Sequence, residues 1–424
     1  MICVGRRLRP LIRCAMNQAA TEDGKLAPKD SSHPGRRQKG LREVVMDFQV
    51  PAEMDTEVER FQTFLDAQVK SRLSKWYHER TIPRSFFSAA GEGGWFGFTW
   101  EKGRISASPA LRGALLIERL ARLSSGVAVA FLAHNDLGMT GLNLFPTHDL
   151  SLYGENAVKG RLLLCLGNTE SEAGSDVANI SMSAEKTDGG WVLNGSKAYV
   201  TNGALSDMAV VTAVEDPKAA RNSRLSMFLV DLASEGVSRA KLNKQVWIPS
   251  DLTRIQMTDV FVPETHLMGK PGRGLQQVLT IFTHSRVFIS AMTLGTAEGA
   301  FDLALSHARK RKIFGVRISD HQFKSFQIAD LYAKMEASRL LIHKACWAMD
   351  RKMPFRLEAS LAKYMTVQTA KEVTEWAADL FGAASVIYEH PIHKFPLDAW
   401  ASSLGEGTQD VQRLVIFREV MRRF

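Results

Sequence analysis

The hydrophobic pattern of this 424-residue chain changes its period twice, and that change constrains the fold more than any other feature. From residue 46 to residue 160, apolar residues recur at spacings of three and four, which is typical of amphipathic helices. Residues 161–272 instead hold short β-prone segments such as "MAVVTAV" and "LSMFLVDL". Helical spacing returns over residues 273–424. This order predicts an α+β protein with an N-terminal helical domain, a middle β domain and a C-terminal helical domain.

Local signals refine both later domains. Asn194-Gly195 lies between β-prone segments and predicts a hairpin turn. The alternating "TRIQMTDVFVP" predicts a half-buried strand that ends at a proline, so the middle domain is expected to be a small barrel or sandwich. Helically spaced apolar residues in the last domain predict the core of a four-helix bundle: Ile328, Leu331, Met335, Ile342, Cys346 and Met349.

The charge distribution argues against a nucleic-acid partner. Residues 1–45 hold ten Lys/Arg and four Asp/Glu, a net charge of +6, so only +3 of the total +9 belongs to the rest of the chain. This basic leader is expected to be disordered, and it is either a mitochondrial presequence or a misassigned leader. The location is therefore predicted to be cytoplasmic, or the mitochondrial matrix if the leader is a presequence. The sequence contains no run of eighteen apolar residues, so no membrane span is expected. Its four cysteines lie far apart, so no metal site is expected from them.

Two polar stretches stand out as candidate sites. In "LGNTESEAGSD", residues 166–176, hydroxyls, small residues and exposed amides share one loop that could contact a planar ring or a phosphate. Taken alone, it could equally be a polar turn leading into a strand. Near the end of the chain, Glu406 lies between Gly405 and Gly407 just before an amphipathic helical run. By itself this carboxylate could be loop decoration or a helix-start acid.

Four motifs in one order resolve these alternatives: "LGNTESEAGSD", "GSKAYVTNG", "RKIFG" and "LGEGTQDVQRL". Together they resemble the acyl-CoA dehydrogenase family of FAD-dependent flavoproteins, over nearly the whole chain from Met46. The resemblance implies FAD as the cofactor. It also implies a set of cofactor-binding residues: Leu166, Gly167, Asn168, Thr169, Gly174, Ser175, Tyr199, Val200, Thr201, Arg311, Phe314, Gln322 and Thr408. In the family, the residues matching Arg311 and Gln322 reach a cofactor bound mainly by a neighbouring subunit.

The resemblance also makes Glu406 the catalytic base of an α,β-desaturation of an acyl thioester. The base removes the α-proton while hydride leaves the β-carbon for the flavin, and the base's own N–H helps to polarise the thioester carbonyl. Some relatives carry the base at the position of Ser285, and serine cannot serve there. The residues expected to bind substrate are Ser175, Phe282, Thr283, Arg286, Gly405 and Gly407.

The departures from the family pattern bear on substrate and assembly. Gly405 replaces an aromatic residue that lines the acyl pocket, and Thr283 replaces an aspartate that contacts the coenzyme A tail. We therefore expect a branched, cyclic or carrier-tethered acyl group, delivered as an acyl-CoA or acyl-carrier-protein thioester. The glycine-rich motif that contacts the cofactor of a second subunit is eroded at residues 379–385, so a homodimer is as plausible as the usual homotetramer. The expected electron acceptor is an electron-transfer flavoprotein or a similar protein. The alternatives are a monooxygenase-type relative and a redox-inactive protein on the same scaffold.

Overall fold

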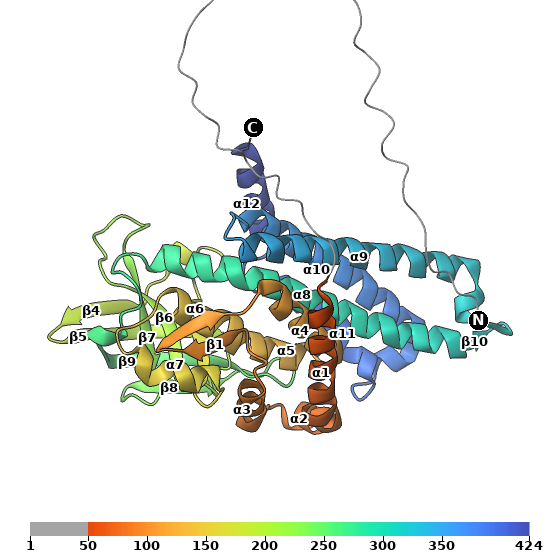
Figure 1. Cartoon of the computed structure of the whole chain (residues 1–424), viewed down its shortest axis with the longest axis horizontal. Helices are drawn as coiled ribbons and strands as arrows, with labels where there is room; N and C mark the ends of the chain where they lie inside the picture. The colour runs from red at the N-terminus through yellow and green to blue at the C-terminus, as the bar shows by residue number, and fades with distance from the viewer. Residues whose placement is uncertain (1–49, 424) are drawn as a thin grey trace, which may run out of the picture. The chain divides into compact units, whose positions relative to one another are not determined.

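The computed structural model describes residues 50–423, and the predicted basic leader lies outside the described residues. The first part is helical, with one short hairpin (Figure 1). Its helices are α1 (Ala52–Gln68), α2 (Leu73–Glu79), α3 (Arg84–Glu92), α4 (Ala110–Leu123), α5 (Ser125–Leu132), α6 (Thr140–Leu144) and α7 (Leu150–Val158). The π-helical segment η2 (Ala133–Met139) joins α5 to α6 without a break. Such π-helical turns are frequent at functional sites.

The hairpin in this part was not anticipated from the helical pattern. Strand β1 (Phe98–Glu101) pairs with β2 (Arg104–Ala107) in an antiparallel register. The two turn residues, Lys102 and Gly103, have φ values of 51° and 76°. Positive φ at both central positions is the requirement of the tight turn that matches the twist of paired strands.

The middle part is one curled sheet of seven strands, with the order β3-β6-β4-β5-β9-β8 and β7 alongside β6. The strands are β3 (Leu164–Gly167), β4 (Ser183–Thr187), β5 (Gly190–Thr201), β6 (Met208–Val214), β7 (Leu225–Asp231), β8 (Val237–Lys241) and β9 (Leu252–Pro263). The segments expected to be strands from "MAVVTAV", "LSMFLVDL" and "TRIQMTDVFVP" all lie in this sheet. Strand β6 is buried along its whole length, whereas β9 alternates buried and exposed residues.

The predicted hairpin turn at Asn194-Gly195 is wrong. Both residues lie inside β5, where the pairing with β9 shifts between Leu193 and Gly195. The Asn194 side chain donates to Asp259 Oδ1 at 3.0 Å and accepts from the Asp259 N–H at 2.8 Å. These bonds satisfy polar groups that the irregular register leaves unpaired, so Asn-Gly here marks a β-bulge. The turn itself lies just before β5, because Thr187 pairs with Gly190.

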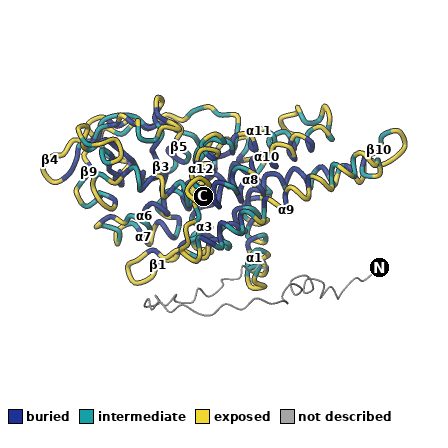
Figure 2. The backbone as a smooth tube through the Cα atoms, turned by 90° about the horizontal axis from the view of Figure 1, so that it is seen from above, coloured by how far each residue is buried: buried dark blue, intermediate teal, exposed yellow. Residues whose placement is uncertain are grey.

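The C-terminal part is built around one central helix. Its helices are α8 (Gly274–Lys310), α9 (Gln322–Asp350), α10 (Arg356–Phe381), α11 (Lys394–Ala401) and α12 (Gln409–Met421). The short strands β10 (Lys312–Ile313) and β11 (Val316–Arg317) form the tip between α8 and α9. The predicted apolar stripe on α9 packs in the main core, as expected of a bundle. In Figure 2, α8 is buried between its neighbours while the β10 tip is exposed.

Helix α8 is long and apolar enough to cross a membrane by length and composition alone. However, 72% of its most apolar window is buried inside the protein, where α8 packs against α4, α9 and α10. A buried core helix meets the same criterion, so its hydrophobicity is accounted for by packing.

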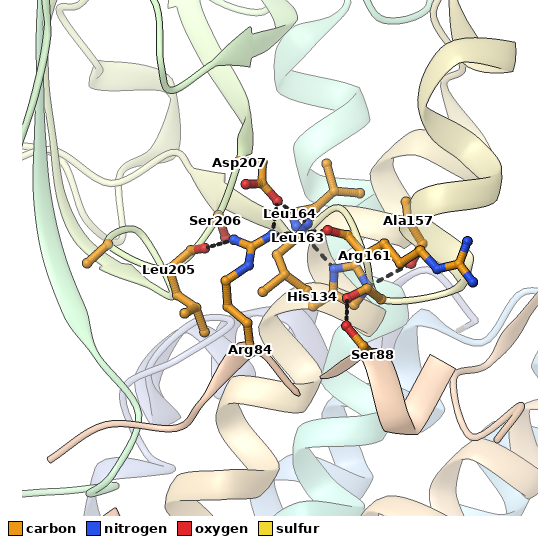
Figure 3. A network of polar contacts seen from close by, with 12 residues as sticks. Arg84, Ser88, His134, Ala157, Arg161, Leu163, Leu164, Leu205, Ser206 and Asp207 are labelled. Carbon is orange, nitrogen blue, oxygen red and sulfur yellow. Dashed lines mark hydrogen bonds and ion pairs between the residues drawn. The ribbon is translucent and has the colours of Figure 1, made fainter. Parts of the chain in front are cut away.

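A polar network joins the first helices to the sheet (Figure 3). The Arg84 guanidinium donates to the Leu205 carbonyl at 2.7 Å and to Asp207 Oδ2 at 2.6 Å. Beside it, the His134 ring accepts from the Leu164 N–H through Nδ1 and contacts the Ala157 carbonyl through Nε2, both at 3.1 Å. Because Nδ1 accepts, the proton of the neutral ring is on Nε2.

This network predicts a loss of stability in mild acid. Burial lowers the pKa of His134 from 6.5 to about 4. Below pH 6.5 the unfolded chain therefore binds a proton that the folded protein excludes. As the pH falls from 6.5 to 4, we expect His134 to reduce the free energy of unfolding by about 3 kcal/mol. Urea denaturation across this range should show a steeper decline for the natural protein than for His134→Gln. Parallel pH profiles for the two proteins would contradict the prediction.

Candidate active site

The predicted cofactor loop is anchored to the ends of two strands. Leu166 and Gly167 end β3, and Tyr199 to Thr201 end β5. The two segments are held together because the Ala198 N–H donates to the Thr169 carbonyl at 2.8 Å. The Asn168 side chain is held by β6, since its Oδ1 accepts from the Thr212 hydroxyl at 2.7 Å. The structure thus brings the predicted loop and the end of β5 side by side.

A buried ion pair supports this loop. Lys197 is 0% exposed, and its ammonium donates to Glu170 Oε1 at 2.7 Å and to the Asn168 carbonyl at 3.2 Å. Glu170 also accepts from the N–H groups of Ser181 and Met182 at 2.7 and 3.0 Å. Burial lowers the pKa of Lys197 to about 8. For Glu170, Lys197 and Ser181 outweigh burial and hold the pKa below its usual value. Both groups are therefore charged at neutral pH.

The end of β5 presents an aromatic ring to the outside of this assembly. Tyr199 has a φ of 56°, and its ring is 61% exposed. Nearby Asn202, with a φ of 62°, donates from Nδ2 to the Ala130 carbonyl at 2.7 Å and ties the strand end to α5. An exposed ring on a rigid strand end can serve as a flat surface for a ring-shaped cofactor.

Glu406 lies in the loop between α11 and α12, on a strained backbone. Its φ is 48°, in the left-handed region that a residue with a Cβ seldom adopts, and Gly407 follows with a φ of 93°. Thr408 then caps α12 by accepting from the Val411 N–H. Left-handed residues of this kind cluster at functional sites. The backbone of the loop thus fits the role expected of Glu406.

Side chains from two helices hold this loop by its carbonyl groups. Arg286 on α8 donates to the Glu406 carbonyl from Nε and Nη2, each at 3.3 Å. Lys363 on α10 donates to the carbonyls of Gly405 and Gly407. Gln412 on α12 donates to the Glu406 and Gly407 carbonyls at 3.2 and 2.9 Å. The backbone of the loop is therefore held through its carbonyl groups by the side chains of Arg286, Lys363 and Gln412.

Glu406 is a half-buried residue with one enclosed carboxylate oxygen. Its Oε2 is shielded from solvent and has no hydrogen-bond partner among residues 50–423. Burial raises the pKa of Glu406, although the charges of Lys363 and Arg286 oppose the shift. Asp136, on η2, is also buried, and burial together with the Glu406 charge raises its pKa to about 8. A raised pKa and an unoccupied oxygen are the properties required of a base that removes a weakly acidic proton.

Two further predicted substrate residues, Phe282 and Thr283, lie on α8 with Ser285, and Gly405 precedes Glu406 in its loop. Phe282 is half-buried beside the sheet core. Thr283 donates its hydroxyl to the Leu279 carbonyl at 2.8 Å, within its own helix. Ser285 is fully buried. At Gly405, an added Cβ would meet only Ile289 Cδ1, at 3.2 Å, within the described chain. Across the loop, Thr408 lines a hollow of about 630 Å³ between α10 and α12.

Three predicted cofactor residues lie elsewhere. Arg311 directly follows α8, Phe314 lies in the turn between β10 and β11, and Gln322 begins α9. Figure 1 shows this tip at the far end of α8 from the sheet. Arg311 follows Arg286 by twenty-five residues of continuous helix, a separation of roughly 37 Å. These residues therefore cannot join Glu406 in a single compact site within one chain.

The residues near the sheet fit a flavin. In the described part of the chain, the Asn168 Nδ2 group is buried without a partner. A Cβ added to Gly174 would meet nothing within 4 Å, and Tyr199 at the strand end is exposed. An unused amide donor, an open loop and an exposed aromatic ring suit a planar, hydrogen-bonding ring. No cluster of three or more metal-ligating side chains occurs among residues 50–423.

Sequence reasoning missed Lys197, Lys363, Gln412 and Asp136. Of these four residues, Lys363 could have been noticed from its position in the helical pattern. It lies three residues after Ser360 and four before Val367, both of which are buried on α10. A lysine at such a position needs polar partners in the interior. The identity of those partners depends on tertiary packing and cannot be read from spacing.

Family profiles match almost the whole described chain. The N-terminal, middle and C-terminal domains of acyl-CoA dehydrogenase match residues 52–151, 165–260 and 272–421. The probable acyl-CoA dehydrogenase fadE25 of Mycobacterium leprae is 34% identical over 316 residues, which cover 73% of this chain and 79% of that protein. The benzylmalonyl-CoA dehydrogenase of Aromatoleum aromaticum is 29% identical over 381 residues, 88% of this chain and 100% of that protein.

Solved structures show the same arrangement. The butyryl-CoA dehydrogenase from Megasphaera elsdenii superposes with a TM-score of 0.85 and 27% identity, covering 89% of this chain and 100% of that chain. The structure of PigA with FAD and proline also superposes with a TM-score of 0.85, at 25% identity and the same coverage.

Proposed function

Because the chain belongs to the acyl-CoA dehydrogenase family, it is an FAD-dependent oxidoreductase acting on CH–CH bonds, and we propose that Glu406 is its catalytic base. The observation that carries this proposal is the enclosed Glu406 Oε2, which has no hydrogen-bond partner among residues 50–423, on a left-handed loop. We further propose that the acyl group is branched, cyclic or tethered to a carrier protein.

The proposed reaction needs three tasks from the chain. Glu406 takes the α-proton, and its buried position makes it a stronger base than an exposed carboxylate. The Glu406 N–H donates to the thioester oxygen, on which negative charge develops. The loop from Leu166 to Ser175, with Tyr199 and Thr201, would hold the flavin, which would supply the hydride acceptor for the β-carbon. Glu406 would thus act on the α-carbon while this loop positions the hydride acceptor at the adjacent carbon.

The acyl group is inferred from the space next to the base. A side chain at position 405 would begin 3.2 Å from Ile289 Cδ1, its one neighbour within 4 Å in the described chain, and Gly405 adds no such bulk beside the base. The similarity to a benzylmalonyl-CoA dehydrogenase is in keeping with a bulky acyl group. A wider pocket holds a thin straight chain less firmly, since fewer contacts fix its α- and β-carbons.

A panel of acyl thioesters tests this function. We expect anaerobic flavin bleaching to be at least about tenfold faster with a branched or cyclic acyl thioester than with butyryl-, octanoyl- or palmitoyl-CoA, because poor positioning costs rate. The matched variant Gly405→Tyr refills the volume and should reverse this preference. Fast bleaching of the natural protein by a straight-chain substrate would overturn the acyl assignment, and a protein that no thioester bleaches would overturn the proposed function.

We also propose an assembly in which the α8–α9 tip serves the cofactor of a second copy. The roughly 37 Å between Arg311 and Arg286 supports it, as do the 98% exposure of Phe314 and the 69% exposure of Phe323. Exposed aromatic side chains of this size are typical of surfaces that a partner covers. The assembly is a homodimer or homotetramer, and an electron-transfer flavoprotein or a similar protein receives the electrons. Cytoplasmic location stays a prediction.

A further inference from the structure

Three consecutive carbonyl groups of the Glu406 loop turn toward the same buried side. The carbonyls of Gly405 and Gly407 accept from the Lys363 ammonium, and the Glu406 carbonyl accepts from Arg286. Lys363 is 0% exposed, and the Glu406 charge favours its ammonium form against the cost of burial. A buried ammonium is costly unless it is hydrogen-bonded, and here the two carbonyls of the loop accept from it.

The direction of these carbonyls fixes the direction of the N–H groups that follow them. In a trans peptide the C=O of one residue and the N–H of the next point in opposite directions. Because the Gly405 carbonyl faces Lys363, the Glu406 N–H faces away from α10. Within residues 50–423 that N–H has no acceptor. Successive N–H groups on left-handed backbone, as at Glu406 and Gly407, form concavities that attract negative charge.

We propose that Lys363 is a positioning residue that aims the Glu406 N–H at the thioester oxygen and strengthens it as a donor. The inference rests on the proposed function, because it assigns a supporting residue to that reaction. An ammonium bound to the carbonyl of a peptide draws electron density from that peptide and polarises its N–H. Lys363 thus acts on the substrate through the Gly405–Glu406 peptide bond without touching it.

The charge of Lys363 gives this role a pH signature. The charged and titratable groups around the loop are Glu406 itself, Lys363 on α10, Arg286 on α8 and Asp136 on η2. Burial lowers the pKa of Lys363 to about 7. Above that pH the ammonium loses its charge, and the Glu406 N–H loses its polarisation. The rate of flavin reduction should therefore fall on the alkaline side.

The test compares Lys363→Met and Lys363→Arg with the natural protein. We expect Lys363→Met to slow flavin reduction by about 10²-fold with KM changed less than about threefold, because the lost interaction forms mainly in the transition state. Lys363→Arg should recover much of the rate and remove the alkaline decline, since arginine keeps its charge. As a control, Lys394→Met removes a half-buried lysine that also donates to a backbone carbonyl, that of Leu123, and should leave rate and profile unchanged.

An infrared titration provides a readout that does not depend on turnover. The carboxyl band of Glu406, identified by its loss in Glu406→Gln, should titrate at higher pH in Lys363→Met, because the neighbouring positive charge is gone. If no thioester reduces the flavin of the natural protein, the proposed function fails, whereas this titration still shows whether the Lys363 charge acts on the Glu406 loop. An unchanged Glu406 titration in Lys363→Met, or a full rate with an intact alkaline decline in Lys363→Arg, would overturn the proposal.

Discussion

Replacing Glu406 with glutamine should leave a yellow, FAD-bound protein whose flavin is reduced about 10³- to 10⁴-fold more slowly by its thioester substrate. The substitution keeps the size of the side chain and removes the proton acceptor, and general base catalysis contributes a factor of this order. The flavin should stay because most of the residues expected to hold it lie at the ends of β3 and β5, and the substitution changes none of the predicted cofactor residues. Stopped-flow absorbance under anaerobic conditions measures the rate directly.

The pH profile sharpens this test. Burial raises the pKa of Glu406 above 4.5, so the base is ionised only at higher pH. The rate of flavin reduction should rise with pH through a midpoint above 4.5, and this rise should be absent in Glu406→Gln. A glutamine variant that kept more than a tenth of the rate would move the role of base to another residue.

The second large effect concerns the ion pair beneath the flavin loop. Lys197→Met should lower the free energy of unfolding by about 3–5 kcal/mol, because Glu170 is left charged and buried without its cation. Adding Glu170→Gln in the same chain should recover part of this loss, since the uncompensated charge is removed. Denaturation by urea, followed by circular dichroism, measures both changes.

An exposed pair provides the matched comparison. Lys334 and Glu372 form an ion pair whose side chains are 52% and 50% exposed. Lys334→Met should cost less than about 1 kcal/mol, because water already screens that pair. A similar small cost for Lys197→Met would show that the buried pair does not support the loop.

Much of the fold follows from periodicity alone. The helical parts and the α9 stripe were predicted because a long element repeats its pattern many times, whereas β6 and β7 were predicted from their β-prone residues. The failures are local. Asn194-Gly195 has the composition of a turn and forms a bulge, because pairing with β9 and the Asp259 contacts outweigh the local preference. The β1–β2 hairpin was missed because four-residue strands carry almost no periodic signal.

The candidate site also contains residues that the sequence predicted and residues that only the structure shows. Glu406 and the flavin loop could be named from ordered motifs, and the structure gives both a suitable setting. Lys363, Asp136 and Lys197 could not, because their importance lies in what surrounds them. A charged residue within an apolar pattern indicates that a polar partner lies in the interior, but the pattern does not identify that partner.

The length of α8 has a consequence for how such a chain can change. This helix carries Arg286, which holds the Glu406 loop, and leads directly to Arg311, the predicted cofactor residue, so one helix sets the interval between them. Each residue of an α-helix adds 1.5 Å and about 100° of rotation. Deleting one residue between these arginines would turn Arg286 away from the Glu406 loop or Arg311 away from its predicted ligand, whereas exchanging one apolar residue for another would not. The number of residues in α8 is therefore under stricter control than their identity, and divergence in this region should proceed by substitution without insertion or deletion.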